Sequence, residues 1–152
     1  MEIKKIISLT LILIFMCGCT KQYTCTKDTT TDDFEYNIEM NLTFSNKKVK
    51  KVSSTVTYRL TDTGYKKIDT LKESLQSKND NYSQHKVIEF NFKIDNKLIN
   101  VYEDIDFSKA SNDERSEILT YNDLSTIYFD SKYKTKEVID ELKNNNFTCE
   151  LK

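Results

Sequence analysis

The stretch that decides the fold runs from Phe34 to Phe44 and reads FEYNIEMNLTF. Large apolar side chains alternate strictly with polar ones, at Phe34, Tyr36, Ile38, Met40, Leu42 and Phe44. Because successive side chains of a β-strand point to opposite faces, this pattern predicts a strand with one buried face and one wet face. An antiparallel sheet that is covered on one side only has this property.

The residues that follow predict a hairpin. Residues 45–48 (SNKK) have turn composition, and Asn46 tolerates a left-handed backbone conformation. A return strand then carries one face of apolar or small side chains, at Val52, Ser54, Val56 and Tyr58. Pairing Leu42 with Val52 requires a loop of three residues rather than two, so we expect a bulged hairpin turn.

A near-copy of this pattern begins at residue 88. Residues 88–97 (IEFNFKIDNK) align with residues 38–47 (IEMNLTFSNK), and five of the ten positions are identical. Duplication and convergence on one hairpin pattern both explain the similarity. The second hairpin turns at residues 95–97 and returns through Ile99, Val101, Ile105 and Phe107. Glu103 interrupts this apolar face, so we expect the strand to reach the sheet rim or a bulge there.

Helical spacing occurs between the hairpins and again near the C-terminus. Residues 61–63 offer N-caps for a first helix, whose apolar positions are Tyr65, Ile68, Leu71 and Leu75. Residues 77–84 predict a polar loop after it. Thr135 is the predicted N-cap of a last helix, with an apolar face of Val138, Ile139 and Leu142.

The remaining segments complete the predicted order ββα-ββα-β. Residues 27–33 predict a loop, residues 114–119 a single helical turn, and residues 124–129 a short buried segment. Short strands are expected near both ends, at residues 23–26 and 147–151. The order predicts an α+β domain over residues 25–152, in which an antiparallel sheet from two β-hairpins has helices packed on one face.

The first nineteen residues predict export. Lys4 and Lys5 precede an apolar run from Ile6 to Met16, about half of the ~20 residues that a membrane-spanning helix needs. The run ends in FMCGC, residues 15–19, which resembles the lipobox of bacterial lipoproteins. That resemblance implies a signal peptide over residues 1–18, a diacylglyceryl group on Cys19, and a lipidated tether over residues 19–24. An ordinary secretory signal with incidental cysteines is the alternative.

Two cysteines remain after this processing. Cleavage removes Cys17 and lipid occupies Cys19, which leaves Cys25 and Cys149 in a compartment that permits disulfides. A Cys25–Cys149 bridge joins the two predicted terminal strands. Closing this long loop stabilises the fold by about 4–5 kcal/mol in the chain-entropy model. Two unpaired thiols are the alternative.

With this order of elements, the chain resembles the YehR-like small bacterial lipoproteins. The resemblance depends on the lipobox at Cys19, the two alternating hairpins and the helix between them. It also depends on residues 104–110 (DIDFSKA) and on the closing helix and phenylalanine at residues 136–147. The cysteine pair is a departure from that pattern. The resemblance implies an α+β fold and membrane anchoring, and it implies no catalytic residues.

Composition limits the possible partners. Without residues 1–18 the chain has 134 residues (152 minus 18), enough for one compact domain. It carries 21 Lys and Arg (23 minus two) and 23 Asp and Glu (24 minus one), a net charge of −2. Such a balance argues against a nucleic-acid partner, which requires a clustered basic surface.

The sequence singles out no catalytic, cofactor-binding or metal-binding residue. His85 is the only histidine, and a Cys149–His85 nucleophile pair competes with the disulfide for Cys149. The acidic pairs at residues 32–33 and at Asp104 and Asp106 offer oxygen ligands for Ca²⁺. Neither pair has the spacing of a calcium loop, so we expect a solvated face or strand rim.

Tyrosine is the last informative residue type. Six of the nine tyrosines lie in or near predicted strands, where they form either a binding surface or the edge of the core: Tyr36, Tyr58, Tyr102, Tyr121, Tyr128 and Tyr133.

We therefore expect a lipid-anchored, extracytoplasmic protein of the cell membrane, a non-catalytic module that binds an envelope protein without a cofactor. A small envelope enzyme or enzyme inhibitor is the alternative. Converging carboxylates in a pocket would favour that alternative, whereas an exposed sheet face or edge would favour the binding module.

Overall fold

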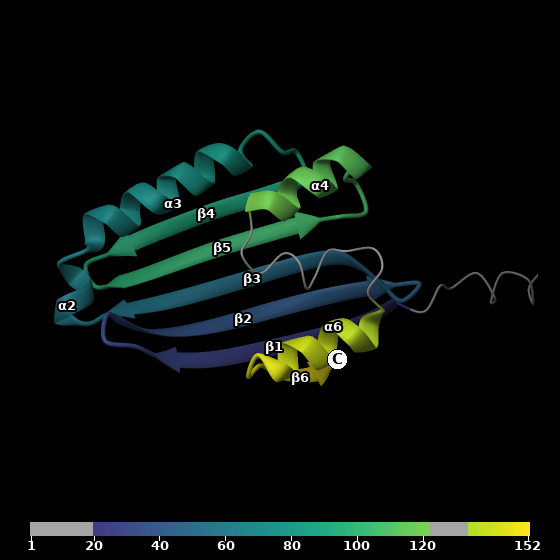
Figure 1. Ribbon diagram of the computed structural model, residues 1–152, viewed down its shortest axis with the longest axis horizontal. Helices are drawn as coiled ribbons and strands as arrows, with labels where there is room; N and C mark the ends of the chain where they lie inside the picture. Colours follow the sequence, from purple (N-terminus) through teal and green to yellow (C-terminus); the bar gives the residue numbers. More distant parts are fainter. Residues whose placement is uncertain (1–19, 122–133) are drawn as a thin grey trace, which may run out of the picture.

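The computed structural model describes residues 20–121 and 134–152 of the chain. Its strands are β1 (Thr20–Thr30), β2 (Phe34–Ser45), β3 (Lys48–Leu60), β4 (Ile88–Asp95), β5 (Leu98–Asp106) and β6 (Thr148–Leu151). Its helices are α2 (Asp62–Tyr65), α3 (Ile68–Tyr82), α4 (Asn112–Tyr121) and α6 (Thr135–Asn144). The strands form one antiparallel sheet in the order β4-β5-β3-β2-β1-β6 (Figure 1).

The three longer helices cover one face of this sheet. Leu75 of α3 packs against Ile99 and Val101 of β5, in a cluster near the β4 edge. Ile118 of α4 and Leu142 of α6 belong to a second cluster, whose members include Cys25, Met40, Leu42, Phe44, Val52 and Ile105. The predicted α+β class, with helices on one face of an antiparallel sheet, is confirmed.

Strand β2 lies near the middle of the sheet, and its two faces are as the alternation predicts. Met40, Leu42 and Phe44 point to the helices and are buried, whereas Glu35, Asn37 and Glu39 are exposed on the other face. The register with β3 is also as predicted, because Leu42 lies opposite Val52 and Ile38 opposite Val56.

The turn between β2 and β3 differs from the expected three-residue loop. Ser45 pairs with Lys48, so only Asn46 and Lys47 form the loop, with φ values of 52° and 64°. Two consecutive positive φ values are the signature of a tight hairpin turn that follows the strand twist. The extra residue lies in the strand instead, as a bulge opposite the step from Thr43 to Phe44.

Strand β1 begins earlier and ends later than the sequence predicts. Residues 20–24, expected as part of a tether, are already in the sheet, and Thr20 lies opposite Ser45. Residues 27–30, expected as loop, extend the strand at its other end. Threonine is favoured in strands, and the ladder to β2 satisfies the backbone along the whole of β1. Residues 20–24 and 27–30 therefore belong to the sheet rather than to a tether and a loop.

Strands β1 and β6 bring the two ends of the domain together. Cys25 lies directly opposite Cys149, and their sulfur atoms form a disulfide with an S–S distance of 2.07 Å. Cys25 is fully buried beneath α6.

The helices also differ in length from the prediction. Helix α3 continues through residues 77–82, because Tyr82 is buried against the sheet and needs the helix to reach it. Helix α4 spans ten residues rather than one turn. Helix α6 starts at Thr135 with Lys134 as its N-cap, one residue before the predicted cap, and buries Val138, Ile139 and Leu142 as expected. The predicted segment at residues 124–129 lies outside the described residues, and no described helix could span a membrane.

Gly64 of α2 is the only glycine after residue 18. A Cβ atom at this position would lie 1.9 Å from the carbonyl oxygen of Asp33. Helix α2 can therefore pack against the β1–β2 loop only with glycine here, and Thr61 caps it by accepting the Gly64 N–H at 3.2 Å.

Candidate functional site

The sheet face turned away from the helices, which we call the open face, is polar. Its side chains come from alternate positions of the six strands, so the period-2 pattern that buries one face also builds this one. Most of them are exposed or half-buried hydroxyl, amide and charged groups, including Thr24, Asn37, Asn41, Ser53, Thr55, Thr57, Asn91 and Asn100.

Hydrogen bonds between neighbouring strands hold these side chains in place. Thr24 Oγ1 donates to Asn41 Oδ1 at 2.8 Å, across β1 and β2. Thr57 Oγ1 donates to Asn100 Oδ1 at 3.1 Å, across β3 and β5. Side chains that are already ordered lose little conformational freedom when a partner binds. The open face is therefore preorganised for polar contacts.

Strands β3 and β5 carry a charged and aromatic group of residues on the open face. Asp104 accepts a hydrogen bond from Ser53. It also forms an ion pair with Lys51, whose Nζ atom lies 2.9 Å from Asp104 Oδ2. The hydrogen bond to Asp104 raises the pKa of Lys51. Beside them lies Tyr102, which is 41% exposed. Its pKa is raised, mainly by partial burial and secondly by the negative charge of Asp104. An exposed tyrosine on a polar surface is a typical anchor for a protein partner.

The carboxylates that offered calcium ligands contact cations of the protein. Asp33 forms an ion pair with Lys67, whose Nζ atom lies 2.6 Å from Asp33 Oδ2. Asp106 is bound by Ser108 and by Lys109 at 2.9 Å, and these hydrogen bonds lower its pKa. Within residues 20–121 and 134–152, no three potential metal ligands lie close enough together to hold an ion.

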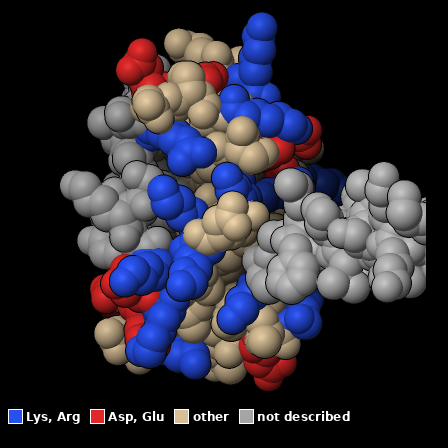
Figure 2. Space-filling model, turned by 90° about the vertical axis from the view of Figure 1, so that its right-hand side faces the viewer, with Lys and Arg blue, Asp and Glu red and all other residues tan. Residues whose placement is uncertain are grey.

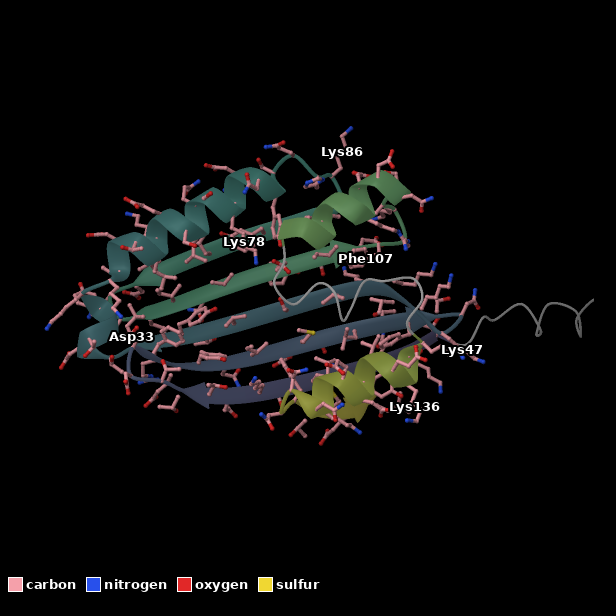
Figure 3. The ribbon with its side chains drawn as sticks, in the orientation of Figure 1. Asp33, Lys47, Lys78, Lys86, Phe107 and Lys136 are labelled. Atoms are coloured by element: carbon pink, nitrogen blue, oxygen red, sulfur yellow. A yellow bond between two sulfur atoms is a disulfide. The ribbon has the colours of Figure 1, made fainter. Side chains whose placement is uncertain are left out.

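Glu103 is neither at the rim nor at a bulge, so that prediction was wrong. It lies in the regular part of β5, opposite Ser54 and Phe90, and is only 8% exposed beneath α3. Lys78 of α3 places its Nζ atom 3.1 Å from the carboxylate (Figure 3). The same ammonium lies 5.1 Å from the ring centre of Tyr82. Lys78 of α3 thus supplies the opposite charge that allows Glu103 of β5 to be buried in the core.

The Cys149–His85 nucleophile pair is excluded by topology. His85 precedes β4 at one edge of the sheet, whereas Cys149 lies in β6 at the other edge. Five strand spacings of about 4.8 Å place the two edges about 24 Å apart. Cys149 is moreover part of the disulfide.

The tyrosines divide between the two faces of the sheet. Tyr36 and Tyr58 pack with Phe34 on the helix side, with ring centres 5.6 to 5.8 Å apart, and burial raises the pKa of Tyr58. They form the edge of the core. Tyr102 alone of the six lies on the open face among residues whose side chains the structure describes. Tyr128 and Tyr133 lie outside the described residues, and the side chain of Tyr121 is not described.

A second surface was missed by the sequence reasoning. Five lysines surround a surface cavity of about 470 Å³ between the start of β1, the β2–β3 turn and α6: Lys21, Lys47, Lys134, Lys136 and Lys143. We call these five residues the basic cluster. Figure 2 shows lysine side chains gathered on this end of the molecule. The overall charge balance conceals the cluster, because its members are far apart in the sequence.

The fold is similar to those of two bacterial proteins of known structure. One is YehR of E. coli, solved by NMR, with 15% sequence identity and a TM-score of 0.60 over 88% of this chain and 93% of that chain. The other is a protein from Streptococcus pneumoniae TIGR4, also solved by NMR, with 13% identity and a TM-score of 0.58 over 88% and 87%. No protein-family model and no curated protein matches the sequence. At these identities, the similarity shows the fold alone.

Proposed function

We propose that this chain is a lipid-anchored module of the cell envelope that binds a protein partner on its open face. The observation that carries the proposal is the preorganised polar face, with Tyr102 exposed on it and the three longer helices all on the opposite side. The chain acts by binding rather than by catalysis. Its anchor confines it to a thin layer, which raises its effective concentration for partners at the same surface.

The lipid attachment belongs to the same proposal. Cys19 is preceded by a short positive region, an apolar run and Gly18, which together resemble a lipoprotein signal. The similarity of fold to YehR, together with residues 104–110, supports a place in the YehR-like lipoprotein family. In this proposal the mature protein starts at Cys19 and is held at the extracytoplasmic face of the cell membrane.

Replacing Cys19 with alanine is expected to abolish lipid attachment without unfolding the domain, because every residue of the two described core clusters follows Cys19 in the chain. Intact-mass analysis of the native protein extracted from membranes should give residues 19–152 plus a diacylglyceryl group. The Cys19→Ala protein should lack this group and leave the membrane fraction. Cys17→Ala is the matched control and should remain lipidated. A processed Cys19→Ala protein that stays tightly bound to membranes would contradict the anchor.

A photo-crosslinking amino acid at Thr55, on the open face, is expected to give discrete adducts with a protein partner in intact cells. The same probe at Lys72, which is exposed on α3, serves as the matched control and should give none. Adding Tyr102→Ala should weaken the Thr55 adducts by about tenfold, the effect of removing one aromatic anchor from an interface. Equal labelling from both positions, or adducts that do not respond to Tyr102→Ala, would argue against the open face.

A further inference from the structure

The basic cluster is assembled from three separate parts of the chain. Lys21 comes from β1, Lys47 from the β2–β3 turn, Lys134 is the N-cap of α6, and Lys136 and Lys143 are exposed residues of α6. The backbone N–H of Thr135 donates to the carbonyl oxygen of Lys47 at 3.1 Å, which fixes the start of α6 beside the turn. The fold therefore holds the lysines together in one place.

The cluster has a large excess of positive charge. Five lysines against one aspartate, Asp140, leave the cavity lining with a net formal charge of +4. Asp140 forms an ion pair with Lys136 and raises its pKa. Among the described residues, no ion pair is formed by Lys21, Lys47, Lys134 or Lys143. Glu137 lies nearby, and its carboxylate accepts the backbone N–H of Lys134 at 2.7 Å. Four ammonium groups thus remain available for an external anion.

The cluster lies beside the expected point of lipid attachment. Lys21 is the second residue of β1 and is two residues from Cys19, a separation of at most about 7 Å along an extended chain. Lys47 and Lys136 lie at the same end of the strands, and Asp33 marks the opposite end (Figure 3). A lipid on Cys19 would therefore bring this end of the domain, and no other, against the bilayer.

We propose that the basic cluster binds the phosphate groups of anionic phospholipids in the membrane that holds the anchor. This inference rests on the proposed lipid attachment. Lysine ammonium groups near an anionic bilayer gain about fivefold in affinity each. With this end seated on the headgroups, the strands point away from the membrane. The open face then stands clear of the bilayer, and α2 lies at the outer end, where both are accessible to a partner.

The test uses the full-length chain, expressed with its own N-terminal segment and mixed with lipid vesicles. One set of vesicles is phosphatidylcholine alone, and the other contains about one third phosphatidylglycerol. The readout is the rate of acetylation of each lysine, measured by mass spectrometry. We expect Lys21, Lys47, Lys134 and Lys143 to react about fivefold more slowly on the anionic vesicles only. The protection should disappear in about 1 M salt, where the screening length is about 3 Å.

Two triple variants that each remove three positive charges distinguish an effect of the basic cluster from an effect of the net charge of the protein. Lys21→Gln/Lys47→Gln/Lys134→Gln should remove the protection of Lys143 on anionic vesicles. Lys66→Gln/Lys72→Gln/Lys93→Gln, at exposed positions outside the cluster, should leave it unchanged. Should the first variant fail to fold, the salt dependence of the native protein still decides the outcome.

The possible results bear on the cluster and on the anchor separately. Flotation with the neutral vesicles reports on the lipid anchor alone, because no anionic lipid is present. Equal acetylation of these four lysines on both kinds of vesicle would overturn the proposal for the cluster and leave the anchor standing. Protection by inorganic phosphate on neutral vesicles would also overturn it, because the cluster would then be a site for a small anion.

Discussion

Replacing both Cys25 and Cys149 with alanine is expected to lower the free energy of unfolding by about 4–5 kcal/mol, the largest effect of any change considered. The bridge spans 124 residues and joins the two ends of the domain, so its removal restores a large amount of conformational freedom to the unfolded chain. Alanine is preferred to serine because Cys25 is fully buried and a hydroxyl there would lack its water partners.

Urea denaturation of the native protein and the double variant provides the measurement. The native protein treated with a reducing agent is the matched control and should unfold at nearly the same urea concentration as the variant. The native protein without reductant should require much more urea. A difference below about 1 kcal/mol would mean that the ladder between β1 and β6 holds the ends together without the bridge.

Replacing Lys78 with methionine is expected to cost about 2–3 kcal/mol of stability. Removing one partner of a buried ion pair costs about 3–5 kcal/mol, and the value here is lower because the Lys78 side chain is 36% exposed. The loss arises because Glu103 would lie beneath α3 without the ammonium of Lys78 beside it. The double variant Lys78→Met/Glu103→Leu should recover most of the loss, because an apolar pair of similar size needs no compensating charge.

A double-mutant cycle followed by urea denaturation measures this coupling. Lys72→Met is the matched control, since Lys72 is exposed on the same helix and has no ion pair among the described residues. It should change stability by less than about 0.5 kcal/mol. If the double variant were as unstable as Lys78→Met alone, the loss would come from helix packing rather than from the charge of Glu103.

Local sequence patterns predicted the elements in which buried and exposed positions recur at regular intervals. The alternation in residues 34–44 identified β2, its buried face and its register with β3, because each residue reports which face it occupies. The apolar positions of α6 were predicted for the same reason. The same alternation defined the open face, and the predicted packing of the helices on one side of the sheet leaves this face uncovered by them.

Features that depend on partners remote in sequence were misjudged. Residues 20–24 and 27–30 have loop composition, and they become strand because all of them pair with β2, while Tyr23 and Thr24 pair with β6 as well. Residues 77–82 look polar, and they become helix because Lys78 and Tyr82 contact β4 and β5. The sequence around Gly64 did not indicate that the carbonyl oxygen of Asp33 would occupy the space of a side chain at this position.

The sequence by itself determined the class of the fold and the inward faces of β2 and α6. The tertiary structure decided the full length of β1, the burial of Glu103 beside Lys78 and the assembly of the basic cluster from three separate segments. The physical reason is the range of the forces involved. A burial pattern can be recognised from residues that are neighbours in the sequence. Ion pairs and charge clusters, in contrast, arise only when the fold brings distant residues within a few ångströms of one another.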